Sequence, residues 1–169
     1  MLAGLLTSIQ ALGFSYTMRL SEAELQGRIE RLMPFERTQY LFTVSLSEPL
    51  IELSETDNQI ALFSAVSVLG PAGLQGRGSA KVKGSIRYER AQGAFFIDQP
   101  SVEQLEIERM PQRLSGELIK VVQTVVSKAL AKYPVYTLRE EDAKQKLAKS
   151  MIDSIRVENK ELIVKLKPM

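Results

Sequence analysis

Apolar side chains recur every three or four residues between Leu114 and Tyr133, and this pattern constrains the fold more than any other feature. The stripe comprises Leu114, Leu118, Val121, Val122, Val125, Val126, Ala129, Leu130 and Tyr133. The spacing predicts a helix opened by Pro111, spanning about 33 Å at the usual rise per residue. Valine is a mediocre helix former, so burial must stabilise this helix. The rest of the chain must therefore supply an apolar surface that covers it.

The residues before this helix alternate between apolar and polar side chains, as strands with one buried face do. We expect strands over residues 40–46, over 50–69 around a turn at Asp57-Asn58, over 78–88, and over 94–109 with a bend at Gln99-Pro100. Pro49 ends or kinks the first of them. The fold class expected is α+β, with a strongly curved antiparallel meander wrapped around the long helix, plus shorter helices.

Shorter elements flank the meander. Ser21 and Glu24 form a capping-box pattern, which predicts a helix over residues 23–33. After the long helix we expect a short strand over 135–138 and then a second helix over 139–155. The inward side chains of that second helix would be Ala143, Leu147, Met151 and Ile152. The chain then ends in a hairpin around Asn159-Lys160.

Composition excludes several kinds of chemistry. The chain of 169 residues is 44% hydrophobic and 25% charged, which suits one globular domain, expected over 14–169. It has neither cysteine nor histidine, so disulfides, thiol nucleophiles and imidazole zinc sites are absent from the sequence. We expect no catalytic residue, no metal and no cofactor. The net charge of +2 is too small to indicate nucleic-acid binding.

The N-terminal segment over residues 1–13 allows two interpretations. It carries no charge, so it is either the remnant of a secretory signal or a short amphipathic helix packed on the domain.

The stretch YPVYTLREEDAKQKLAKSMIDSIRVENKELIVKL, with the valine-rich helix and the meander before it, resembles the YceB-like bacterial lipoproteins, a domain family of unknown function. That family looks like the tubular lipid-binding (TULIP) superfamily, which includes the bactericidal permeability-increasing protein. The resemblance implies a curved sheet around a long helix, apolar ligands between them, and a periplasmic or cell-envelope location. Family lipoproteins carry a lipobox cysteine that this sequence lacks, so either its N-terminus has been cut or it is secreted without an anchor.

Two sets of residues are candidate binding sites. An apolar groove between helix and sheet would be lined by Val121, Val122, Val125, Val126, Leu130, Phe42, Val44, Val82 and Ile86. The same residues also suit a plain packed core. Gly78, Ala80 and Gly84 remove side-chain volume from the inward face of one strand, which either lets the sheet curl on the helix or leaves room for a ligand.

The second set is a basic stripe on the opposite face of the same strand, formed by Arg77, Lys81, Lys83 and Arg87. These cations would contact anionic lipid head groups, or they form an ordinary solvated face. The sequence GLQGRGSAKVKG does not fit a phosphate-binding loop, because a strand rather than a helix follows it. The expected function is therefore lipid or hydrophobic-ligand binding. The alternative is a structural or partner-binding envelope protein with a dry core.

Overall fold

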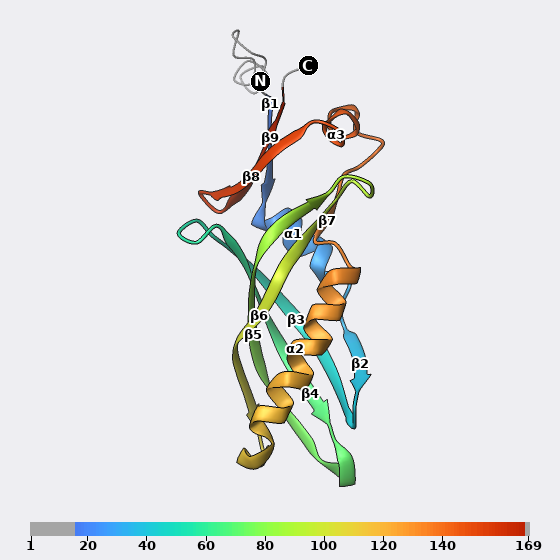
Figure 1. Ribbon diagram of the computed structural model, residues 1–169, viewed down its shortest axis with the longest axis vertical. Helices are drawn as coiled ribbons and strands as arrows, with labels where there is room; N and C mark the ends of the chain where they lie inside the picture. The colour runs from blue at the N-terminus through green and yellow to red at the C-terminus, as the bar shows by residue number, and fades with distance from the viewer. Residues whose placement is uncertain (1–15, 168–169) are drawn as a thin grey trace.

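The computed structural model describes residues 16–167, which form two antiparallel sheets and three α-helices in an elongated molecule (Figure 1). The class is α+β, as the sequence predicts. The segment over residues 1–13, with its two interpretations, lies outside the described residues. Over 16–167, no helix combines the length and the hydropathy needed to cross a bilayer.

The larger sheet is the predicted meander, because its strand order β2-β3-β4-β5-β6-β7 follows the sequence. Its strands are β2 (Phe35–Gln39), β3 (Phe42–Ser54), β4 (Gln59–Leu69), β5 (Gln75–Glu89), β6 (Ala94–Glu108) and β7 (Tyr136–Thr137). Both predicted irregularities are present. The pairing of β3 with β4 shifts around Pro49, and in β6 Gln99 takes a φ of 48° beside Pro100.

The strand predicted over residues 40–46 is wrong at its start. Gln39 pairs with Phe42, so Tyr40 and Leu41 form the turn between β2 and β3. Neither residue belongs to the types that usually mark a hairpin turn, and the alternating pattern continues through it. The sequence therefore gives no local signal for β2.

The smaller sheet joins both ends of the described chain in the order β1-β9-β8. It contains β1 (Tyr16–Ser21), β9 (Glu161–Leu166) and β8 (Ile152–Glu158), the last two forming the predicted hairpin around Asn159-Lys160. Helix α1 (Glu22–Glu30) follows β1 and begins with the predicted capping box, in which the Glu24 amide donates to Ser21 Oγ at 3.2 Å. The buried side chains Leu25 and Ile29 join the hydrophobic core.

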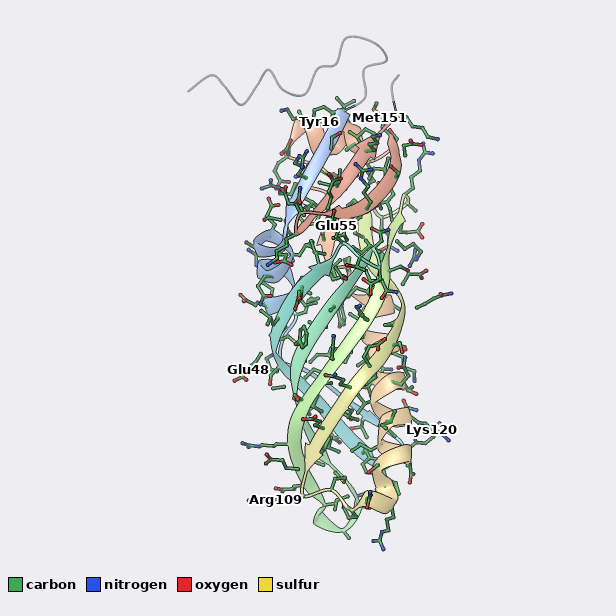
Figure 2. All side chains as sticks on the ribbon, turned by 90° about the vertical axis from the view of Figure 1, so that its left-hand side faces the viewer. Tyr16, Glu48, Glu55, Arg109, Lys120 and Met151 are labelled. Atoms are coloured by element: carbon green, nitrogen blue, oxygen red, sulfur yellow. The ribbon has the colours of Figure 1, made fainter. Side chains whose placement is uncertain are left out.

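Helix α2 (Ser115–Lys132) is the predicted long helix, preceded by a 3-10 turn (Gln112–Leu114). It packs its apolar stripe on one face of the larger sheet and contacts β6 and β2. The sheet is not strongly curled, so the expected wrapping around the helix is wrong. An amphipathic helix needs cover on its apolar face only. The opposite face of α2 carries exposed charged residues, and Lys120 points away from the sheet (Figure 2).

The C-terminal helix α3 (Ala143–Ala148) is much shorter than the prediction over 139–155. Residues from Ile152 onward pair with β9 instead, so long-range strand pairing overrides the local helical pattern. Leu147, predicted to face inward, is 58% exposed. The strand predicted over 135–138 is reduced to β7, which pairs with the start of β6.

Candidate functional site

An apolar cavity lies between the larger sheet and the C-terminal half of α2, beside the segment that joins α1 to β2. Its described lining residues are aliphatic or aromatic apart from Ser64: Ile29, Leu32, Met33, Phe35, Leu46, Leu62, Ser64, Ala80, Val82, Val126, Ala129, Leu130 and Tyr133. Five separate segments of the chain thus contribute to one apolar surface. Such a surface favours hydrocarbon and disfavours ordered water.

The cavity is small, with a volume of about 30 Å³. That is room for roughly two water-sized groups, so a whole acyl chain does not fit without separation of the surrounding elements. The structure therefore contains a small apolar cavity within an otherwise packed core.

The cavity reaches the surface between α2 and the α1–β2 segment. Leu32, Met33, Phe35 and Tyr133 are half-buried there. The rings of Phe35 and Tyr133 pack edge to face, with centroids 5.8 Å apart and an interplanar angle of 74°. We call this pair the aromatic mouth. It joins the edge strand β2 to the end of α2.

Ser64 is the polar member of the lining and is itself buried. Its Oγ lies 2.9 Å from the carbonyl oxygen of Ser47 and 2.9 Å from that of Ala65, so the hydroxyl donates to the backbone of the sheet. Ser47 precedes the irregularity in β3, where the regular pairing with β4 is interrupted. The hydroxyl therefore satisfies local backbone groups, which leaves the cavity apolar in character.

The structure brings only part of the predicted groove together at this cavity. Val126, Leu130 and Val82 line it. Ile86 is half-buried and packs against the core away from the lining. The remaining predicted groove residues are buried in the packed core, which supports the plain-core interpretation for them: Val121, Val122, Val125, Phe42 and Val44.

Sequence reasoning identified Ala80 as a small inward-facing residue, but it missed Phe35, Leu62 and Tyr133 as lining residues. Phe35 was missed because the hairpin turn before β3 has no turn residues to mark it. Tyr133 belongs to the predicted helical stripe, and the position of Leu62 in an alternating strand was a usable signal.

The inward-facing glycines of β5 do not provide ligand space. A Cβ placed on Gly78 would lie 1.6 Å from the carbonyl oxygen of Glu106, and one on Gly84 would lie 2.6 Å from Ile97 Cγ2. The neighbouring strand β6 fills the volume that the missing side chains leave. Close approach of two backbones therefore explains these glycines.

The basic stripe lies on the face of β5 opposite to α2, as predicted, but two of its four cations have acidic partners. Lys83 forms an ion pair with Asp57, and this hydrogen-bonded partner lowers the pKa of the Asp57 carboxyl. Arg87 lies 3.0 Å from Glu89. A second carboxylate, Asp98, lies 3.4 Å from the same guanidinium.

The other two cations also have nearby groups. The Lys81 ammonium lies 5.3 Å from the ring centroid of Phe63, within cation–π range. Arg77 is the cross-strand neighbour of Glu108. Opposite charges thus border the stripe on the same sheet face, which favours an ordinary solvated surface over a head-group site.

Within residues 16–167, no three acidic side chains lie close enough together to hold a metal ion.

A sequence model of the family described as "Protein of unknown function (DUF1439)" matches residues 20–161 of this chain. No curated protein matches the chain. The matched range begins in β1 and ends at β9, so it includes α2 and every residue that lines the cavity.

Proposed function

The chain belongs to the family described as "Protein of unknown function (DUF1439)", and we propose that it binds a lipid or another hydrophobic small molecule at the cavity beside α2. The observation that carries this proposal is an apolar cavity that opens to the surface at the aromatic mouth. The proposed role is binding without catalysis, in keeping with a sequence that has neither histidine nor cysteine.

Binding begins with the end of an apolar chain entering at the aromatic mouth. Each methylene group transferred from water into the lining contributes about 0.8 kcal/mol. The cavity as it stands accepts only the first groups, so deeper insertion requires β2 and α2 to separate. Strand β2 is a five-residue edge strand that pairs with β3 on one side only. Its displacement should therefore cost less free energy than that of any other element of the lining.

The resemblance to YceB-like lipoproteins and the tubular lipid-binding superfamily supports this proposal independently of the cavity. It also supports a location in the periplasm or cell envelope. The superfamily is expected to hold apolar ligands between a helix and a sheet, and the cavity lies between these same two elements.

Two matched substitutions on α2 test the proposal. Ala129 lines the cavity, whereas Ala131 is exposed on the same helix two residues later. Ala129→Leu should fill the cavity and reduce uptake of a fluorescent fatty-acid analogue, and Ala131→Leu should leave uptake unchanged. Equal uptake by the two variants, with both folded by circular dichroism, would contradict binding at this cavity.

The second candidate function is a structural or partner-binding envelope protein with a dry core. The small volume of the cavity favours it. If the unmodified protein takes up no fatty-acid analogue at all, this candidate replaces ligand binding.

A further inference from the structure

The turn between β2 and β3 places two large apolar side chains in solvent. Tyr40 is 74% exposed and Leu41 is 73% exposed. They form a two-residue hairpin turn, because Gln39 pairs with Phe42. Tyr40 adopts a φ of 56°, the left-handed region that bulky residues rarely occupy.

Folding alone does not account for these two residues. Two-residue hairpin turns with a positive φ favour glycine, asparagine or aspartate. In the turn between β8 and β9, Asn159 follows this preference at a φ of 51°, whereas Lys160 beside it has a φ of 58°. Tyr40 opposes the local preference, and the exposed side chains of Tyr40 and Leu41 recover little packing in return. Positions that break a local rule without a structural gain are where functional residues are found.

Further uncharged surface lies at the same end of the molecule. The β2–β3 turn and the β4–β5 loop both lie at the end remote from α3 (Figure 1). Leu69, at the end of β4, is 52% exposed and pairs with Thr43 of β3. Residues 38–47 and 64–76, which contain the turn and the loop, include no charged residue. We call Tyr40, Leu41, Leu69 and the loop over residues 70–74 the apolar tip.

Cations border the tip. Arg37 shares a face of β2 with Gln39, and the Lys128 ammonium donates to Gln39 Oε1 at 3.0 Å. Within residues 16–167, no ion pair includes Arg37 or Lys128. The carboxylate of the same strand, Glu36, belongs to its other face. The side of the tip nearest α2 therefore combines apolar side chains with cations that lack a carboxylate partner.

We propose that the apolar tip docks on an anionic lipid bilayer, with Tyr40 and Leu41 entering the interface while Arg37 and Lys128 contact head groups. Tyrosine is favoured at membrane interfaces, and nearby cations strengthen binding to anionic lipids. A protein partner is a poorer fit, since a stable interface buries about 800 Å² per partner and this tip is a narrow turn beside a short loop. This proposal does not depend on ligand binding at the cavity. It assigns membrane contact to the apolar tip and not to the basic stripe on β5.

The absence of tryptophan from the sequence makes a direct test available. In the full chain, Tyr40→Trp places one fluorophore at the tip, and Leu147→Trp places one at the exposed control position on α3, at the opposite end. Each variant is mixed with vesicles of phosphatidylcholine, with or without phosphatidylglycerol. We expect a blue shift, and quenching by brominated acyl chains, for Tyr40→Trp with phosphatidylglycerol and neither effect for Leu147→Trp. An unchanged Tyr40→Trp spectrum would overturn the proposal.

A second variant distinguishes a loss of vesicle binding from a loss of folding stability. Tyr40→Gly suits the positive φ, so the melting temperature should stay the same or rise. Co-sedimentation with the phosphatidylglycerol vesicles should nevertheless weaken about tenfold, because one large side chain no longer enters the interface. Unchanged co-sedimentation of Tyr40→Gly would show that another part of the chain binds the vesicles and would reject the tip.

Discussion

Phe35 and Tyr133 meet edge to face across the opening of the cavity, with ring centroids 5.8 Å apart. One ring belongs to the edge strand β2 and the other follows the last turn of α2. Residues almost a hundred positions apart in the sequence thus form a contact at the opening of the apolar cavity.

Replacing one ring should open the aromatic mouth. We expect Phe35→Ala to speed the uptake of a fluorescent fatty-acid analogue while reducing the free energy of unfolding by about 2 kcal/mol, since the side chain is only half-buried. Stopped-flow fluorescence and urea denaturation measure the two effects. Thr38→Ala, on the exposed part of the same strand, is the control. Slower uptake in Phe35→Ala than in the control would show that the pair does not restrict entry.

The side chain of Gln123 hydrogen-bonds to the backbone of β6 on the edge where no neighbouring strand pairs with it. Its side-chain amide donates to the carbonyl oxygen of Pro100 at 2.7 Å and accepts from the amide of Val102 at 2.8 Å. On the other edge of the sheet, Gln26 of α1 binds β3 in the same way, through the carbonyl of Pro49 and the amide of Ile51. Both helices therefore satisfy backbone groups that no neighbouring strand pairs.

Gln123→Ala should reduce the free energy of unfolding by about 1 to 3 kcal/mol, because it leaves two part-buried backbone groups without their partner. Thr124→Ala on the same helix loses only a bond to the carbonyl of Lys120 and should change stability by less than about 0.5 kcal/mol. Urea denaturation compares them. Equal stability of both variants would mean that water replaces the amide at no cost.

The glycines of β5 and α1 should respond in opposite directions to alanine. Gly78→Ala should cost about 3 kcal/mol or more, because the new methyl group overlaps the carbonyl oxygen of Glu106. Gly27→Ala, in the interior of α1 with no atom within 4 Å of the new Cβ, should gain about 0.5 to 1 kcal/mol. Thermal denaturation measures both. A small effect at Gly78 would show that β6 moves away easily and that the strand pair is loosely held.

Stability should fall at high pH in a way that depends on Tyr88. Burial raises the pKa of the Tyr88 hydroxyl above its usual value near 10, and this hydroxyl donates to the carbonyl of Lys149 at 2.5 Å. The folded state therefore holds this proton more tightly than the unfolded state does. The associated stability is complete below the unfolded pKa and is lost as the pH rises through the folded value.

Tyr88→Phe removes this titration. Its melting temperature should decline less steeply above about pH 10 than that of the unmodified protein. The two proteins differ only in the hydroxyl group at position 88, so the difference between their two curves isolates Tyr88. If the melting temperatures of the two proteins declined in parallel with pH, the Tyr88 hydroxyl would be equally protonated in the folded and the unfolded state.

Much of the fold could be predicted because its signals are local. The helical spacing of the valines defines α2, alternation defines β4 to β6, and Ser21 with Glu24 defines the start of α1. The parts that could not be predicted depend on contacts distant in the sequence. Tyr16 pairs with Leu166 in the smaller sheet, and the pairing of residues 152–158 with β9 shortens α3.

The candidate site was predicted only at Val126, Leu130 and Val82, because a hydrophobic pattern identifies buried residues without separating a cavity from a filled core. The mouth depends on β2, whose turn at Tyr40 and Leu41 contradicts the usual turn chemistry. The curvature was overestimated because a continuous apolar stripe requires cover along its length and does not require cover on all sides.

Native mass spectrometry of the protein purified without detergent is the most direct test of hydrophobic-ligand binding. The account predicts additional mass from a lipid or fatty acid on the unmodified protein and on Ala131→Leu, and its loss from Ala129→Leu. Bare protein in all three samples, or the same adduct on all three, would contradict a ligand site beside α2.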